Sequence, residues 1–364
     1  MQILELFEKI LSFRSITPDD AGAFEFIEDY LSEFEVIKLD LEGVKNRFFY
    51  KKFGEGEHLC FAGHIDVVPA GEGWSSDPFT PTYKDGFIYA RGAQDMKSGL
   101  SAFLKATKDL KEFNGTLSVL LTSDEEGAAK FGTIKVLQHL KEIDFLPDFA
   151  IVAEPTCEDV FGDAIKIGRR GSINGIIEKM GTQGHAAYPQ KSKNPIHKVA
   201  TVLPDMAGAF LDNGDDDFAP SQFVITDIRA GMQVTNVTPA NLKMMFNIRN
   251  STKTTLDDVK GFVDGYFKDM DYTLSLEQSA KPFVTKRDSR VVNVVSQAIV
   301  DIVDITPKLS TAGGTSDARF FGEFGVDTVE FGVKNDTIHA IDERVGIKEV
   351  EELHRVFTRV LEIF

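Results

Sequence analysis

The chain has 364 residues, of which 42% are hydrophobic, so it is long enough for about two domains with a core each. Its 57 acidic and 40 basic side chains give a formal net charge of −17 at pH 7, which disfavours binding to nucleic acid or to an anionic membrane surface. Two cysteines cannot form a disulfide framework, and the sequence shows neither a secretory signal peptide nor an apolar run of membrane-spanning length. We therefore expect a cytoplasmic protein that binds neither nucleic acid nor membrane.

The first 168 residues alternate between helical and strand patterns. Helical spacing of apolar residues predicts a helix over residues 2–13, and Thr17 before Pro18 predicts the start of a second helix that ends near residue 34. A third helix is predicted over residues 96–113 and a fourth through residue 136. Apolar runs predict strands at residues 36–39, 47–53, 58–61, 117–121 and 149–153. This alternation is typical of an α/β sheet with helices on both faces.

The pattern changes after residue 168. Residues 169–281 read as strand, helix, strand, strand, helix and strand, at residues 172–180, 195–211, 221–230, 241–249, 254–268 and 272–280. This β-α-β-β-α-β order is that of a ferredoxin-like unit. Helical spacing resumes at residue 289, and residues 350–364 predict an amphipathic helix. We expect one α/β domain formed by residues 1–168 and 282–364, with residues 169–281 inserted as a ferredoxin-like α+β domain.

Side chains that can bind a metal ion follow three of the predicted strands. His64 and Asp66 end the strand that begins at residue 58, an acidic run of residues 124–126 follows the strand at 117–121, and Glu154 follows the strand at 149–153. The carboxyl ends of strands are where open α/β sheets place their sites. Taken alone, the pair of His64 and Asp66 favours a structural histidine. Together these residues favour a metal centre.

Two more residues extend this set. Asp95 stands at the entrance of the helix predicted from residue 96, where an N-cap is the alternative role, and His339 is the remaining candidate ligand. Imidazole and carboxylate without thiolate suit Zn²⁺, or Mn²⁺ and Co²⁺. Two such ions about 3.5 to 4 Å apart polarise a carbonyl group and activate water, so the pattern indicates hydrolysis. The sequence lacks the central motifs of a serine α/β-hydrolase and of a P-loop protein.

Over residues 2–360 the chain resembles the M20 family of di-zinc peptidases and deacylases, which includes acetylornithine deacetylase. The matching strings are GHIDVVP (63–69), GW (73–74), PF (78–79), RGAQDMKSG (91–99), DEEG (124–127), EPT (154–156), RRGS (169–172), GHAAYP (184–189), GGTSD (313–317) and NDTIH (335–339). The resemblance implies a mixed-sheet, zinc-peptidase-like catalytic domain with an inserted dimerisation domain. At residue 94 the chain departs from the family, because Gln94 stands where a small residue is expected.

The resemblance also implies roles for individual residues. Asp95 would bridge two Zn²⁺ ions per subunit, with Co²⁺ or Mn²⁺ as substitutes. His64 and Glu154 would complete one site, and Glu126 and His339 the other. Glu125 would act as the general base and acid, and Asp66 would orient His64.

For the substrate, the resemblance implies a small, multiply anionic N-acyl amino acid and a homodimeric enzyme. The residues that would bind the substrate are Arg170, Ser172, His185, Asn236, Arg249, Thr315 and Asn335, with His185 reaching the partner's active site. The expected reaction is hydrolysis of N-succinyl-LL-2,6-diaminopimelate to succinate and LL-2,6-diaminopimelate, in lysine and peptidoglycan precursor synthesis. The alternatives are another deacylase or dipeptidase of the family, such as one that acts on N-acetylornithine, and a catalytically inactive dimeric metal-binding module.

Overall fold

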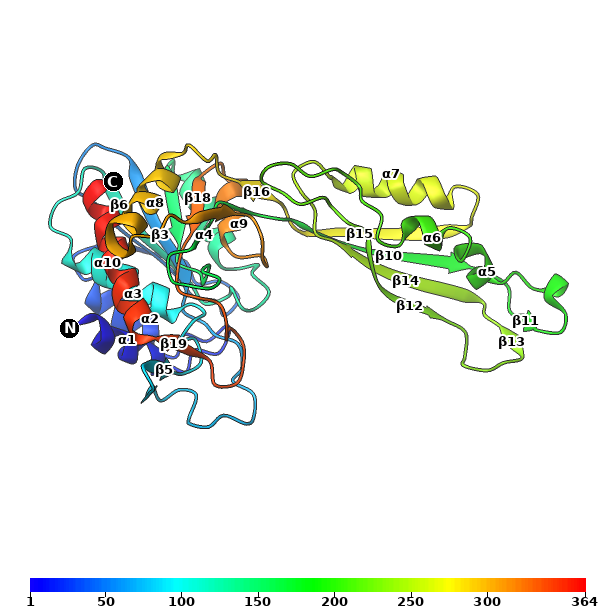
Figure 1. The fold of residues 1–364 in the computed structure, drawn as a ribbon, viewed down its shortest axis with the longest axis horizontal. Coiled ribbons are helices and arrows are strands. Elements are labelled where there is room, and N and C mark those ends of the chain that lie inside the picture. The colour runs from blue at the N-terminus through cyan, green and yellow to red at the C-terminus, as the bar shows by residue number, and fades with distance from the viewer. The chain divides into compact units, whose positions relative to one another are not determined.

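The computed structural model describes residues 1–364, which form two compact units. The first unit comprises Met1–Gly168, Val284–Ser310 and Ser316–Phe364, and the second comprises Arg169–Phe283 and Thr311–Thr315. Figure 1 shows the ribbon of the whole chain with its elements labelled. None of the helices combines the length and the apolar character that crossing a membrane requires.

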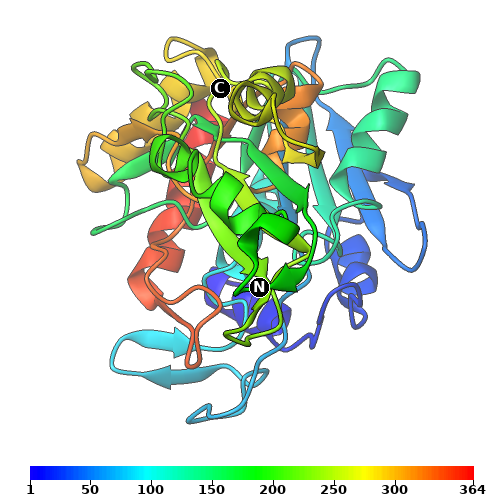
Figure 2. The ribbon, with the colours of Figure 1, turned by 90° about the vertical axis from the view of Figure 1, so that its right-hand side faces the viewer.

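The first unit is built on an eight-stranded sheet with the order β1-β2-β6-β3-β7-β18-β8-β17. Its strands are β1 (Glu35–Lys38), β2 (Asn46–Lys52), β3 (His58–His64), β6 (Thr116–Thr122), β7 (Phe149–Val152), β8 (Ala164–Lys166), β17 (Lys308–Ser310) and β18 (Asp327–Glu330). Strands β6, β3, β7 and β18 are parallel, whereas β2 runs antiparallel to β6. The sheet is therefore mixed, as predicted. A small separate sheet contains β4 (Thr82–Lys84), β5 (Phe87–Tyr89) and β19 (Arg344–Gly346), and β4 and β5 are the light blue arrows at the lower left of Figure 2.

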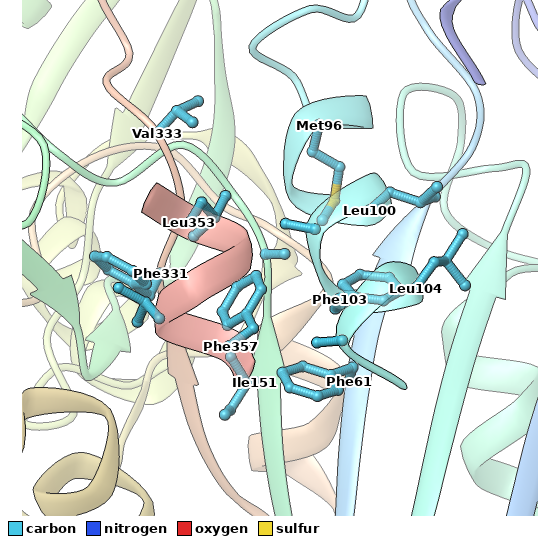
Figure 3. Close-up of a cluster of buried hydrophobic side chains, with 14 of the residues drawn as sticks. Phe61, Met96, Leu100, Phe103, Leu104, Ile151, Phe331, Val333, Leu353 and Phe357 are labelled. Carbon is cyan, nitrogen blue, oxygen red and sulfur yellow. The ribbon is translucent and has the colours of Figure 1, made fainter. Parts of the chain in front are cut away.

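Seven helices belong to this unit: α1 (Ile3–Leu11), α2 (Ala23–Tyr30), α3 (Lys97–Asp109), α4 (Thr133–Glu142), α8 (Arg290–Val303), α9 (Ala318–Glu323) and α10 (Ile347–Ile363). Every residue of β3 and β6 is buried, which fits central strands that are covered on both faces. Figure 3 shows part of the core, where Phe61 of β3 meets Phe103 of α3 and Phe357 of α10. The rings of Phe61 and Phe103 are stacked with their centroids 5.5 Å apart. This packing fixes α3, and with it the residues just before α3, against the central strand.

Phe103→Ala should lower the free energy of unfolding by about 3–5 kcal/mol, because it removes a fully buried ring and leaves a cavity that the surrounding side chains fill only in part. Chemical denaturation of the purified variant measures this loss. Ile143→Ala is the control, because Ile143 is 48% exposed at the end of α4 and its truncation should change the stability by no more than about 0.5 kcal/mol. Equal stabilities of the two variants would contradict this description of the core.

The second unit has a four-stranded antiparallel sheet with the order β12-β14-β10-β15. Its main elements are β10 (Ser172–Met180), α5 (Pro195–Val199), α6 (Leu203–Met206), β12 (Val224–Ala230), β14 (Asn241–Ile248), α7 (Leu256–Phe267) and β15 (Tyr272–Ala280). Its short elements are β11 (Gly184–His185), η1 (Pro189–Lys191) and β13 (Val237–Thr238), whereas β9 (Gly168–Arg169) and β16 (Phe283–Val284) each span a boundary between the units. Every second residue of β14 is buried, and α5, α6 and α7 lie on one face of the sheet (Figure 1). The predicted β-α-β-β-α-β order is thus present.

Two predicted helices differ from the structure. The second helix begins at Ala23 and not after Thr17, because the N–H of Thr17 donates to the carbonyl oxygen of Val67 and ties this segment to the chain that follows β3. Gly22 is the N-cap residue, and the carboxylate of Asp20 accepts a hydrogen bond from the N–H of Phe24 in the first turn. The helix therefore starts six residues after Thr17.

The helix predicted over residues 195–211 is replaced by the short helices α5 and α6. Pro204 lies in the first turn of α6, where its missing N–H does no harm, but a continuous helix would need that donor. Beyond α6, Ala209 and Leu211 form backbone hydrogen bonds with Phe223 and Ser221, so this segment is extended. Helical spacing alone did not reveal that pairing.

Candidate active site

The predicted ligands come together in the first unit because the strands that carry them are neighbours. Strand β3 lies between β6 and β7, and all three are parallel. His64 is the last residue of β3, the acidic run 124–126 follows β6, and Glu154 follows β7. Their side chains therefore start from the same edge of the sheet, as predicted from the sequence. Asp95 precedes α3, and His339 lies between β18 and β19.

The carboxylate of Asp95 lies between the two histidines. One oxygen, Oδ1, is 3.2 Å from Nε2 of His64, and the other, Oδ2, is 3.3 Å from Nε2 of His339. Nε2 of His64 is also 3.7 Å from Oε1 of Glu154, and Nε2 of His339 is 2.9 Å from Oε1 of Glu126. Each histidine therefore shares Asp95 and has one glutamate of its own. This is the grouping that the resemblance implies.

This donor set fits divalent cations. The ligand atoms of His64, Asp95 and Glu126, which include members of both groups, lie within 4.8 Å of one another, so the two groups lie close together. Burial raises the pKa of Glu154 well above its usual value, and the charge of Asp95 adds to the effect. The pKa of His339 is raised to about 10, first by its hydrogen bond to Asp95 and then by that to Glu126. So many carboxylates in a buried site require positive charge, which bound cations can supply.

The three consecutive acids after β6 have different surroundings. The carboxylate of Asp124 accepts hydrogen bonds from the N–H groups of Ala128, Lys130 and Phe131, so it stabilises the following turn. Glu126 contacts His339. Burial raises the pKa of the Glu125 carboxyl well above its usual value; His64 opposes this shift, and the charges of Asp317, Asp95 and Glu126 add to it. Glu125 is thus surrounded by the other acids of the site.

Asp66 is fully buried and contacts two elements of the site. Its backbone oxygen lies 2.8 Å from Nδ1 of His64, whereas its carboxylate oxygen Oδ1 lies 3.7 Å from that nitrogen. The other carboxylate oxygen accepts a hydrogen bond of 3.1 Å from the N–H of Glu126. Asp66 therefore contacts His64 mainly through its backbone, and its side chain holds the start of the turn that carries Glu126.

Of the residues predicted to bind substrate, His185 and Asn236 are brought together by the pairing of β11 with β13. The N–H of Ala186 donates to the backbone oxygen of Asn236, and both predicted residues are exposed. Ser172 is buried, and its hydroxyl accepts a hydrogen bond from the side-chain amide of Asn247. Arg170 is half-buried, and its Nε has no hydrogen-bond partner in the protein. Arg249 is exposed. These residues and Thr315 belong to the second unit, whereas Asn335, exposed, belongs to the first.

Two buried charged residues near the site were not anticipated from the sequence. Lys97, in the first turn of α3, is fully buried, donates to the backbone oxygen of Phe13 at 2.8 Å, and has a pKa lowered to about 7 by burial. Glu343 is fully buried and accepts hydrogen bonds from the segment that precedes α3. Lys97 could have been noticed in the sequence, because it is a charged residue within the apolar pattern of the predicted helix. Glu343 precedes a short strand and carries no signal of its own.

Comparisons with known proteins identify the family of this chain. Residues 60–363 match the peptidase family M20/M25/M40. Two curated proteins named succinyl-diaminopimelate desuccinylase are similar to this chain over its whole length. The one from a Nitratiruptor species is 68% identical to it, over 100% of both chains. The one from Nautilia profundicola is 66% identical to it, over 100% of this chain and 99% of the relative.

Solved structures share the fold. Aminopeptidase PepT from Bacillus cereus has a TM-score of 0.82 and 19% identity, covering 99% of this chain and 97% of that chain. A dinuclear metal binding peptidase, the YXEP protein of Bacillus subtilis, has a TM-score of 0.71 and 13% identity, covering 99% of this chain and 97% of that chain. The predicted fold class is confirmed. This chain belongs to the peptidase family M20/M25/M40.

Proposed function

We propose that this protein is a metal-dependent amidohydrolase that cleaves N-succinyl-LL-2,6-diaminopimelate to succinate and LL-2,6-diaminopimelate. The observation that carries the proposal is the position of Asp95 between His64 and His339, with a glutamate beside each histidine. The substrate is supported by the relatives that are 66% to 68% identical over the whole chain. In this account the reaction belongs to lysine and peptidoglycan precursor synthesis.

The chain's own residues would hold two ions. His64, Asp95 and Glu154 would ligate one, and His339, Asp95 and Glu126 the other; we propose Zn²⁺, with Co²⁺ or Mn²⁺ as substitutes. When bound, such a pair polarises the amide carbonyl and makes water nucleophilic near neutral pH. Asp66 would keep His64 and the backbone of Glu126 in place for this task.

Glu125 would move the proton. Asp124 is engaged in the turn and Glu126 contacts His339, so Glu125 is the remaining acid of the run. Its carboxylate would accept a proton from the attacking water and donate it to the leaving amine nitrogen, which must be protonated before the C–N bond breaks. A catalytically inactive metal-binding module would have no use for this additional acid.

The second unit would supply substrate recognition and dimerisation. We assign residues 1–168 and 282–364 to the catalytic domain and residues 169–281 to a dimerisation and lid domain. The substrate carries several carboxylates, for which the proposed contacts are Arg170, Ser172, Arg249, Thr315 and Asn335. The arginines would provide local positive charge in a chain with a net charge of −17. Asn236 would contact the substrate, and His185 would stabilise the oxyanion in the partner's site.

A homodimer is also supported by exposed apolar side chains on the second unit. Phe210 is 64% exposed, and Val224 and Ile228 are exposed on the edge strand β12. We expect a mass in solution of twice the chain mass of 40.3 kDa. A fully active monomer would contradict the proposed role of His185. We place the protein in the cytoplasm, since Cys60 and Cys157 are buried free thiols.

Product analysis tests the proposed reaction. Protein loaded with Zn²⁺ should release succinate and LL-2,6-diaminopimelate in equal amounts from the succinylated substrate. The same preparation after removal of the metal is the control and should release neither. Failure of the metal-loaded dimer to release succinate would overturn the proposal.

A further inference from the structure

We infer that Gln94 is a positioning residue that, together with Glu343, holds the segment of His339 against the segment of Asp95 and so preforms the metal site that His339 completes. This inference rests on the proposed metal centre. It concerns residues that are not themselves ligands in the proposal. The starting point is the weak support around His339, whose side chain is 48% exposed.

The ring of His339 is therefore not fixed by burial, and its position depends on the backbone that carries it. That backbone is in the left-handed region, with φ of +58° at His339. His339 contacts Glu126 and Asp95, which lie far away in the sequence. A ligand of this kind binds tightly only when its loop is already in place, since ordering a free loop costs conformational entropy.

Gln94 joins the two segments through its side-chain amide. Its oxygen, Oε1, accepts hydrogen bonds from the N–H of Thr337 at 2.8 Å and from the hydroxyl of Thr337 at 2.9 Å. Its nitrogen, Nε2, donates to the carboxylate of Asp336. Gln94 is 2% exposed, so these bonds form in a dry environment where a lost partner is costly. They fix the two residues that lie just before Ile338 and His339.

Glu343 makes the reciprocal connection from the other side of the same loop. Its Oε1 accepts hydrogen bonds from the N–H groups of Gln94 at 2.7 Å and Asp95 at 3.1 Å, and its Oε2 accepts from the N–H of Gly92 at 3.0 Å. The guanidinium group of Arg91 forms an ion pair with this buried carboxylate, with Nη1 2.7 Å from Oε2 of Glu343. The same group donates a hydrogen bond of 3.3 Å to the backbone oxygen of His339. The loop is thus attached to the Asp95 segment both before and after His339.

The residue at position 94 therefore matters to the metal site for a chemical reason. A small side chain at this position could not reach Thr337, so the backbone N–H of Thr337 would lose its acceptor. Glutamine is long enough, and its amide offers an acceptor and a donor at once. Residues that orient metal ligands in this way change metal affinity by about 10- to 100-fold when they are removed.

Gln94→Met tests the inference, because methionine keeps the length and apolar volume of the side chain but not its hydrogen bonds. The matched control is Gln297→Met. Gln297 is exposed on α8, and its side-chain amide donates a hydrogen bond to Asp301 in the next turn of the same helix. Stepwise binding constants for Zn²⁺ are measured by competition with a chromophoric chelator. His339→Ala identifies which constant belongs to the site that His339 completes.

We expect Gln94→Met to weaken that constant by about 10- to 100-fold and to leave the other constant unchanged. In the metal-free protein, hydrogen exchange in the peptide 335–343 should become faster than in the wild type and in Gln297→Met. The inference would be overturned if Gln94→Met bound both Zn²⁺ ions with wild-type constants, or if hydrogen exchange in its peptide 335–343 were unchanged. If Gln94→Met does not fold, Thr337→Val should weaken the same constant, because it removes the hydroxyl that donates to Gln94 and that also bonds the backbone of Arg344 within the same loop. None of these readouts depends on the substrate, so they remain decisive if the proposed reaction is wrong.

Discussion

Glu125→Gln is expected to retain both metal ions and to lower kcat by about 10²- to 10⁴-fold, the usual contribution of a general acid–base group. Glutamine has nearly the same shape as glutamate but cannot take a proton from water or give one to the leaving amine. The metal ions should remain, because none of the side chains placed around Asp95 is changed. The effect should appear in kcat far more than in KM.

Steady-state kinetics and a metal count on the same preparation measure this prediction. Glu351→Gln provides the matched control, because Glu351 is exposed on α10 and should behave as wild type. Unchanged turnover in Glu125→Gln would eliminate Glu125 as the proton-transfer group. Loss of metal from this variant would instead make Glu125 a ligand.

Removal of the metal should abolish turnover completely and lower the melting temperature. The side chains of Asp95, Glu154 and Glu126 lie together and are 13%, 9% and 7% exposed, so bound cations would stabilise the charged form of these carboxylates and the metal-free protein loses that stabilisation. A ligand that binds only the folded state contributes about 2.7 kcal/mol of stability at a free concentration of 100 times its Kd. Adding Zn²⁺ back to the wild type should restore both activity and melting temperature.

Asp95→Ala should resemble the metal-free protein and should not recover when Zn²⁺ is added. This variant removes the carboxylate that faces both histidines, so both ions should bind more weakly. His339→Ala should weaken one ion and leave the other. Full activity of Asp95→Ala at a low Zn²⁺ concentration would contradict the proposed bridging role.

The position of the site was predictable because three ligand-bearing segments follow apolar strands. The strands that end at His64 and that precede Glu126 and Glu154 are recognisable as buried runs, and parallel pairing brings their carboxyl ends together. Asp95 and His339 were harder to place. Each belongs to a loop whose course depends on tertiary contacts, and the resemblance to a known family was needed to assign them.

The connection made by Gln94 and Glu343 could not be predicted, because its hydrogen bonds join residues that are 242 to 252 positions apart in the sequence. A similar limit explains the helix predicted at Thr17. Its local signals are those of an N-cap, but a backbone hydrogen bond to Val67 determines the conformation of that segment. Local propensity yields to tertiary contacts in both cases. The substrate contacts in the second unit likewise depend on the family resemblance and stay predictions.

The most direct test of the central claim compares kcat/KM for N-succinyl-LL-2,6-diaminopimelate with kcat/KM for N-acetylornithine in the Zn²⁺-loaded protein. Both substrates contain an N-acyl amide, but they differ in the acyl group and in the number of carboxylates, so the ratio reports which substrate the site recognises. We predict that the succinylated substrate is strongly preferred. Faster turnover of N-acetylornithine would contradict the proposed substrate while leaving the family assignment intact.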